Sequence, residues 1–116
     1  MVLAIDFGTS YTVLCRWNAA TQSSEVLTLG AVAQRGAGPA VVPSLLYVED
    51  AQQNQVLIGQ PVRDRGLDGS SERCFKNFKR GIGTSIQGFM PDLDGRTLSF
   101  EQVGDCFLSQ VIAQLK

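Results

Sequence analysis

The 116-residue chain carries 10 basic and 11 acidic residues, so its formal net charge at neutral pH is −1. This balance gives no electrostatic reason to expect a nucleic-acid partner or an anionic membrane surface. Hydrophobic residues make up 44% of the chain and charged residues 18%, which is typical of a globular protein and excludes a disordered tail, and the length suits one domain.

The first third of the sequence predicts three antiparallel strands. A short apolar run over residues 2–5 is bounded by turn-forming residues and indicates a buried strand. Residues 11–17 are rich in β-branched and aromatic side chains and predict the returning strand. After a polar turn over 18–24, residues 25–29 alternate between polar and apolar, which predicts the third strand.

The middle of the sequence predicts short strands joined by loops. Residues 30–39 contain three glycines and a proline and indicate a loose loop. Residues 42–48 and 56–58 predict two further strands. Residues 59–61, Gly-Gln-Pro, can open a brief helix because proline is tolerated in the first helical turn. Residues 66–71 indicate an exposed loop.

The last third predicts two helices separated by a turn. Phe75, Phe78 and Ile82 recur at spacings of three and four, which indicates one apolar face of a helix over 75–82. The pair Asp94-Gly95 predicts a tight turn between strands, and the spacing of nearby carboxylates does not continue as an EF-hand requires.

The final helix has the clearest signals in the chain. Ser99 with Gln102 three residues later is a capping-box signature for its start. Its apolar stripe comprises Val103, Cys106, Phe107, Val111, Ile112 and Leu115. Because the stripe runs to the last residues without a glycine cap, we expect the chain to be cut within this helix.

Histidine is absent, which excludes Ser-His-Asp and Cys-His catalysis within these residues. Cys15, Cys74 and Cys106 are widely separated and lack CxxC spacing, so we expect reduced, mostly buried thiols and neither a disulfide framework nor a zinc site. No apolar stretch approaches the roughly 20 residues that cross a bilayer. These features predict a cytoplasmic protein without a nucleic-acid or membrane partner.

The segment from Asp6 to Tyr11 carries the strongest chemical signal. Gly8 lacks a Cβ, so the backbone can turn sharply there and an anion can approach closely. The amides of Thr9, Ser10 and Tyr11 can then form a concavity for phosphate oxygens. Asp6 is a hard oxygen ligand suited to Mg²⁺, directly or through water. The alternative is an ordinary tight hairpin, since Asp, Gly, Thr and Ser are common turn formers.

Residues 3–11 resemble the first phosphate motif of the superfamily of actin, sugar kinases and heat-shock chaperones. Four later segments, in matching order and approximate spacing, are similar to the heat-shock protein 70 (DnaK-like) branch. They are the Pro-Ser strand at 42–48, the Ile-Gly segment at 57–62, the Lys-Arg-x-Ile-Gly element at 78–83 and the strand-to-helix step at 97–103. The resemblance therefore covers nearly the whole chain.

This resemblance implies that residues 1–116 are the N-terminal part of an actin-like, ribonuclease H-like ATPase domain. The expected fold class is α+β or α/β, with a mixed β-sheet, hairpins and two or three helices. The implied cofactors are ATP or ADP with Mg²⁺. The implied partners are the remainder of the ATPase domain and, for the full-length protein, unfolded polypeptide and co-chaperones. The chain would supply one side of the nucleotide cleft, so we expect it to hydrolyse ATP negligibly by itself.

The resemblance also implies individual roles, with Asp6, Thr9 and Lys79 as the catalytic set. Asp6 would organise Mg²⁺ through the waters of the ion, and Thr9 could orient the attacking water. Lys79 would stabilise charge on the γ-phosphate. The residues implied to hold the β- and γ-phosphates are Gly8, Thr9, Ser10 and Tyr11. Without the resemblance, Lys79 reads as a solvated lysine, and Lys76 is a nearby rival.

Two departures from the family pattern indicate a divergent branch. The loop over 30–42 lacks the Asn-rich, Arg-containing approach to the Pro-Ser strand, and Gly81 occupies a position that is usually apolar. Two alternatives stay open. One is a sugar or metabolite kinase of the same superfamily. The other is a non-catalytic actin-like structural or interaction module.

Overall fold

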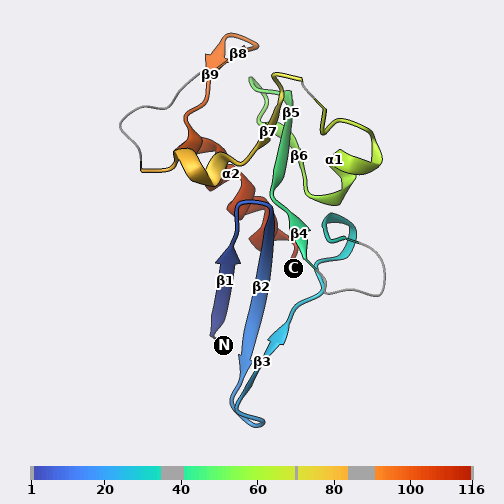
Figure 1. The fold of residues 1–116 in the computed structure, drawn as a ribbon, viewed down its shortest axis with the longest axis vertical. Helices are drawn as coiled ribbons and strands as arrows, with labels where there is room; N and C mark the ends of the chain where they lie inside the picture. Colours follow the sequence, from blue (N-terminus) through green and yellow to red (C-terminus); the bar gives the residue numbers. More distant parts are fainter. Residues whose placement is uncertain (1, 35–40, 70, 84–90, 116) are drawn as a thin grey trace.

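The computed structural model describes residues 2–34, 41–69, 71–83 and 91–115. Within these residues the chain builds three sheets and two α-helices around an elongated body of 50 × 32 × 23 Å (Figure 1). All pairs between the described strands are antiparallel, so the arrangement is α+β. The expectation of a mixed sheet is wrong for this part of the chain.

The first sheet forms the narrow end of the molecule in Figure 1. Its strands are β1 (Leu3–Phe7), β2 (Tyr11–Asn18), β3 (Ser23–Val26) and β4 (Val42–Pro43). β1 pairs with β2, and β3 and β4 pair with opposite ends of β2. The predicted hairpin and third strand are thus confirmed, with β3 displaced toward the turn, and a 3₁₀ turn, η1 (Gly30–Val32), follows.

β1 is exposed, although the sequence predicted a buried strand. Leu3 is 36% exposed and Ile5 is 40% exposed, whereas Phe7 at the end of β1 is partly buried. The reason is that β1 is an edge strand in the described chain: β2 pairs with one side of it, and only its Phe7 end packs on the core. The apolar run at 2–5 has the character of a strand covered on both faces, but here both faces remain open.

The single strand predicted over 42–48 is divided at Ser44 between two sheets. β4 ends at Pro43, and β5 (Leu45–Asp50) enters the second sheet. The Ser44 amide donates to the Ser10 carbonyl at 2.9 Å, and its hydroxyl donates to the Gly8 carbonyl at 2.9 Å. Because that hydroxyl has one hydrogen, the 2.9 Å contact with Thr12 Oγ1 is donated by Thr12.

The second sheet has the strand order β6 (Gln55–Ile58), β5, β7 (Cys74–Lys76). The predicted strand at 56–58 and the brief helix after it are confirmed, the helix being α1 (Gln60–Asp64). Gly59 joins them with φ of 70°, a conformation that favours glycine. A Cβ at this position would lie 2.3 Å from the Val32 carbonyl oxygen, so this bend also has no room for a side chain.

The helix predicted over 75–82 is wrong. Residues Cys74–Lys76 form β7 and pair with β5, Asn77 adopts a left-handed φ of 58°, and a 3₁₀ turn, η2 (Phe78–Gly81), follows. The spacing of Phe75 and Phe78 matched a helix because both side chains are buried in the same core, from a strand and from a turn. Pairing with β5 gives the backbone N–H and C=O groups of these residues the hydrogen-bond partners that a helix would otherwise have supplied.

A small hairpin of β8 (Asp92–Leu93) and β9 (Arg96–Thr97) docks on the second sheet. Its turn residues, Asp94 and Gly95, have φ of 57° and 85°, which fits a type I′ turn and confirms the predicted turn. Both terminal nitrogens of Arg73 donate to the Asp94 carboxylate, and the Ala51 amide donates to it at 3.0 Å. These contacts fix the hairpin to the main body.

We expect this attachment to be sensitive to acid. The Arg73 guanidinium, helped by the Ala51 amide, lowers the pKa of Asp94 to about 2. The ionised Asp94 carboxylate therefore stabilises the fold at pH values above its unfolded pKa of about 4. This contribution is lost as the pH falls toward 2 and the carboxylate becomes protonated in the folded protein. Asp94→Asn should therefore lower the urea midpoint at pH 7 but not near pH 2.

Urea unfolding of wild type and Asp94→Asn at pH 7, 4 and 2.5 measures whether the two urea midpoints approach each other as the pH falls. Asp105→Asn is the control, because that carboxylate makes no ion pair within the described residues. An equal gap between wild type and Asp94→Asn at all three values would contradict the assignment.

The last helix, α2 (Phe100–Ala113), begins as predicted. The Ser99 hydroxyl accepts from the Gln102 amide, and the Gln102 side chain accepts from the Ser99 amide at 2.8 Å. Of the predicted stripe, the members that are fully buried are Val103, Phe107 and Val111. Ile112 is 45% exposed, so the stripe is buried only along its first three turns.

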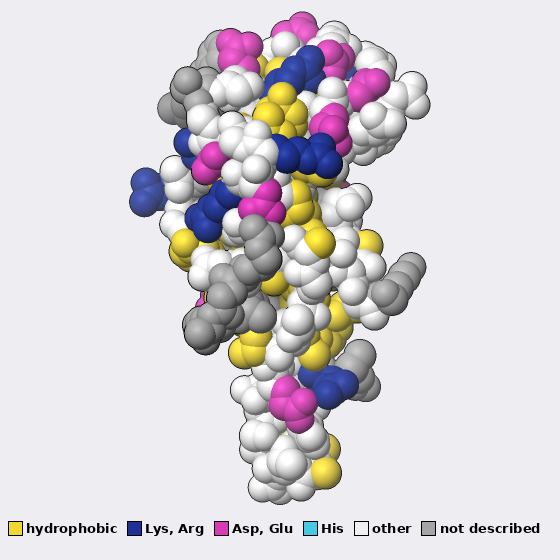
Figure 2. Space-filling model, turned by 90° about the vertical axis from the view of Figure 1, so that its right-hand side faces the viewer, with side chains coloured by type: hydrophobic (Ala, Val, Ile, Leu, Met, Phe, Trp, Pro, Cys, Tyr) yellow, Lys and Arg dark blue, Asp and Glu magenta, His cyan; other side chains and the backbone are white. Residues whose placement is uncertain are grey.

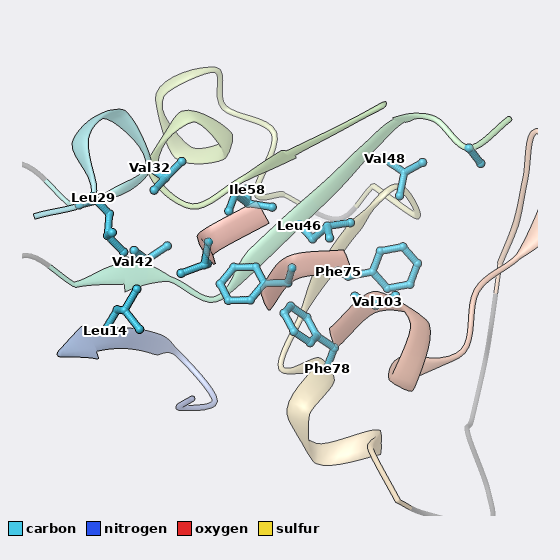
Figure 3. Close-up of a cluster of buried hydrophobic side chains, with 14 of the residues drawn as sticks. Leu14, Leu29, Val32, Val42, Leu46, Val48, Ile58, Phe75, Phe78 and Val103 are labelled. Carbon is cyan, nitrogen blue, oxygen red and sulfur yellow. The ribbon is translucent and has the colours of Figure 1, made fainter. Parts of the chain in front are cut away.

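The core lies where α2 crosses the junction between the first and second sheets (Figure 3). Figure 3 shows Leu14 of β2 and Val42 of β4 at one end of this cluster and Val48 of β5 at the other. At its centre the rings of Phe7, Phe78 and Phe107 meet, with centroids 5.4 to 6.0 Å apart. This aromatic junction joins β1, η2 and α2.

The described part of the face drawn in Figure 2 shows no charge bias that would select a charged partner. On the face drawn in Figure 2, basic and acidic side chains are interspersed over the broad end of the molecule. Cys15, Cys74 and Cys106 are free thiols, but they are half-buried, in contrast to the mostly buried thiols predicted. Across the described ranges, no helix has both the length and the apolar character needed to span a membrane.

Candidate functional site

The turn between β1 and β2 consists of Gly8, Thr9 and Ser10. The Gly8 amide donates to the Tyr11 carbonyl at 2.9 Å, which closes the turn. None of the backbone hydrogen bonds among the described residues uses the amide of Thr9 or Ser10. Two successive unpaired amides in a tight turn are the donors from which an anion-binding concavity is made.

Gly8 is required by the geometry of this turn. A Cβ built on Gly8 would lie 2.4 Å from the Tyr11 carbonyl oxygen, closer than real Cβ contacts permit. The reason is close approach of two backbone segments and not an unusual φ angle. The predicted sharp turn at Gly8 is therefore present, and the Tyr11 carbonyl occupies the space beside the missing Cβ, while the approach of an anion there stays a prediction.

Ser44 anchors the turn through hydrogen bonds to Gly8 and Ser10, a role that the sequence analysis missed. Its side chain is 2% exposed and bonds to Gly8, while its amide bonds to Ser10. The two ends of the turn are thus tied to the point where the chain passes between the sheets. The available signal was a hydroxyl residue inside the apolar run 42–48, because a buried hydroxyl must find hydrogen-bond partners.

Asp6 lies one residue before Phe7 and is exposed. Successive strand residues point to opposite faces, so its carboxylate lies on the face away from the aromatic junction. It shares that face with Tyr11, because Asp6 pairs with Val13 in the register. Within the described chain no group of three or more acidic or cysteine side chains could hold a metal, so Asp6 is a single carboxylate.

Lys79 lies beside the end of β1. Its Nζ atom is 5.9 Å from the centroid of the Phe7 ring, within the range of a cation–π contact. The aromatic junction explains this position, because Phe78 packs on Phe7 and leads directly into Lys79. Lys79 and Asp6 therefore flank the end of β1 from opposite faces and form no ion pair with each other.

Lys76, the rival lysine, is used elsewhere. Its Nζ atom donates to the Asp68 carbonyl at 2.8 Å, on the loop after α1. Lys76 belongs to β7, whereas Lys79 belongs to η2, the element that packs on Phe7. Of the two lysines, the contact with the end of β1 belongs to Lys79.

Arg63 is a second cation beside the turn, and no sequence pattern pointed to it. Its guanidinium carbon lies 5.3 Å from the centroid of the Tyr11 ring, and its Nη2 atom is 3.3 Å from the Tyr11 hydroxyl. Tyr11 follows the turn directly and shares a face with Asp6. The turn is thus flanked by Lys79 on one face and by Arg63 on the other.

Thr9 has the least defined role among the predicted residues. It is half-buried, and its hydroxyl makes no hydrogen bond to another described residue. Its side chain is therefore free to serve a ligand, as is the Ser10 side chain next to it. Together, the turn can offer amides and hydroxyls to an oxyanion, with one cation on each side.

The sequence matches no protein-family model, and no curated protein has a significantly similar sequence. The interpretation of the turn consequently depends on its residues and on the geometry around it.

Proposed function

We propose that the β1–β2 turn binds the phosphates of Mg-ATP and that the chain is the N-terminal lobe of an actin-like ATPase similar to the heat-shock protein 70 family. The observation that carries this proposal is the contact between Lys79 and Phe7. It brings the Lys-Arg element beside the Asp-Phe-Gly-Thr-Ser turn although the two are far apart in sequence. An ordinary hairpin would not require a lysine beside the end of its first strand.

The electrostatics of the turn support a polyanionic ligand. The amides of Thr9 and Ser10 supply donors, and Lys79 and Arg63 supply positive charge on either side. Preorganised donors and cations around a transferring phosphoryl group are the main means by which proteins stabilise it. In this proposal Lys79 compensates charge on the γ-phosphate and Gly8 allows the close approach of the backbone.

Asp6 is the residue that would hold Mg²⁺, through water. Magnesium keeps most of its waters and is usually bound by one or two carboxylates together with substrate phosphates, so a single exposed carboxylate fits this role. When bound, the ion would neutralise part of the phosphate charge. The chain's own contribution is to orient the phosphates with the turn.

The open faces of β1 support a partner lobe. A strand whose exposed side chains are apolar on both faces, with Leu3 and Ile5 on one face and Ala4 on the other, is typical of the interior of a layered domain. We propose that the remainder of the ATPase domain covers β1 and completes the nucleotide site. Unfolded polypeptide and co-chaperones would be partners of that complete protein.

A titration of the chain with Mg-ATP followed by amide NMR tests the site. We expect the Thr9 and Ser10 amide signals to shift with a Kd of about 1 mM, because half a site loses much of its affinity. Lys79→Ala should weaken binding by about 10- to 100-fold, the usual range for a charge-assisted contact. Lys76→Ala is the matched control and should bind as wild type does.

Several outcomes would refute this proposal. Shifts that spread away from the turn, or equal effects of Lys79→Ala and Lys76→Ala, would contradict the assigned site. Turnover of ATP by the chain alone, lost in Lys79→Ala, would show that no partner lobe is needed. Phosphorylation of a sugar by the complete protein would favour the kinase alternative, and assembly that ignores nucleotide would favour a structural module.

A further inference from the structure

A cavity lies between the second sheet and α2, away from the β1–β2 turn. Its volume is about 380 Å³, which falls within the roughly 300–1,000 Å³ of small-molecule sites. Its apolar lining includes the half-buried Val56 and Leu98, together with Leu46, Val48 and Val103, which are no more than 1% exposed. Figure 3 shows Leu46 and Val48 on β5 and Val103 on α2 at this end of the core.

Arg96 and Asp105 place opposite charges in the lining of this cavity. Arg96 is anchored by one nitrogen only: its Nη1 atom donates to the Ala51 carbonyl at 2.8 Å and to Asn54 Oδ1 at 3.1 Å. Its Nη2 and Nε atoms have no acceptor among the described residues. A guanidinium held in this way is preorganised to bind a carboxylate through its remaining nitrogens.

Asp105 lies on the second turn of α2 and also lines the cavity. It forms no ion pair with Arg96 or with any other described residue. Two opposite charges that face one cavity without pairing leave a positive group and a negative group to be matched by a ligand.

We infer that this cavity binds a small zwitterion with an apolar body, such as an aliphatic amino acid or a short peptide of such residues. The ligand carboxylate pairs with Arg96, its ammonium group pairs with Asp105, and its aliphatic side chain lies on Val56 and Leu98, the apolar lining residues that are only half-buried. Apolar lining supplies affinity and the few polar groups fix the orientation, as in other small-molecule sites.

Cys106 provides a direct readout, because it lines the same cavity. Burial raises the pKa of the Cys106 thiol, so alkylation is best followed at mildly alkaline pH. Cys15 is a half-buried thiol on β2 outside the cavity and serves as the internal control. Peptide-resolved mass spectrometry separates the two rates.

The probes are leucine and leucyl-leucine, which carry the same charged ends at different separations. We expect calorimetry to give a Kd of about 1 mM for at least one probe. At about ten times that concentration, alkylation of Cys106 should slow about tenfold, because only the unoccupied protein reacts. The rate at Cys15 should stay unchanged.

Two variants test the charged groups. Arg96→Gln and Asp105→Asn should each weaken binding by about tenfold or more, the range for loss of one charge-assisted contact. Because Arg96 also bonds to the β5–β6 turn, its variant is checked for folding by circular dichroism. Asp105 is a solvent-exposed residue of the cavity lining, so Asp105→Asn should leave the fold intact and its effect on binding can be interpreted directly.

Absence of heat and of Cys106 protection with both probes would overturn the inference. Equal binding of 4-methylpentanoate or leucinamide, each lacking one charge of leucine, would overturn the zwitterion assignment, and so would unchanged binding by Asp105→Asn. Lys79→Ala should bind both probes normally, so failure of this inference and failure of the proposed ATP site are separable.

Discussion

Replacing Phe107 by alanine should lower the free energy of unfolding by about 3–5 kcal/mol. The Phe107 ring is fully buried, and its centroid lies 5.4 Å from that of Phe78 and 6.0 Å from that of Phe7. Its removal leaves a cavity where α2, η2 and β1 meet, and rigid neighbours cannot fill it. Against a typical total stability of about 5–15 kcal/mol, this loss is large. Urea unfolding followed by circular dichroism measures it.

Ile112→Ala is the matched control for this experiment, because it truncates an aliphatic side chain on the same helix. Ile112 is 45% exposed, so its loss should cost no more than about 1 kcal/mol. A cost for Phe107→Ala as small as that for Ile112→Ala would show that the aromatic junction does not hold the three elements together. We also expect Phe107→Ala to weaken Mg-ATP binding, because Phe78 and Phe7 position Lys79.

The sequence predicted correctly those parts of the fold whose conformation is decided by neighbouring residues. The capping box at Ser99, the Asp94-Gly95 turn and the hairpin of β1 and β2 all carry their reason within a few residues. Each depends on side-chain capping, a left-handed backbone or alternation, which neighbouring residues decide.

The failures occurred where distant partners decide the conformation. Residues 75–82 have helical spacing, but pairing of Phe75 with Leu46 makes a strand, and the left-handed Asn77 ends it. In the sequence, Gly81 stands out only because its position is usually apolar in the family that the chain resembles. In the structure it gives space to the Phe100 ring, since a Cβ at Gly81 would lie 2.1 Å from Phe100 Cδ2. Neither contact can be read from local sequence.

The candidate site, like the fold, was predictable from the sequence only in part. The turn and Lys79 were named from motif order, and the structure brings Lys79 to the end of β1. Ser44 and Arg63 were missed as members of the site because their relation to the turn depends on β4 and α1 folding beside β2. Their partners are 36 and 52 residues away in sequence, so local patterns contain no trace of them.

Gly8→Ala should disrupt the β1–β2 turn and abolish Mg-ATP binding. The added Cβ would lie 2.4 Å from the Tyr11 carbonyl oxygen, so the backbone must move apart. That movement breaks the Gly8–Tyr11 hydrogen bond and the contact from Ser44 to the Gly8 carbonyl, both 2.9 Å long. We expect a loss of about 1–3 kcal/mol in the free energy of unfolding, the usual cost of overpacking. Urea unfolding and the NMR titration with Mg-ATP measure the two effects.

Gly69→Ala is the matched control for Gly8→Ala, because it makes the same chemical change where there is space. No atom lies within 4 Å of a Cβ built on Gly69, and its backbone is not left-handed. Its stability should therefore change by less than about 1 kcal/mol, with a slight gain expected from the reduced entropy of the unfolded chain. If Gly8→Ala kept both the stability and the Thr9 and Ser10 shifts of wild type, the close approach at Tyr11 would not define the turn. If it unfolded partly but bound Mg-ATP as before, the phosphate site would lie elsewhere.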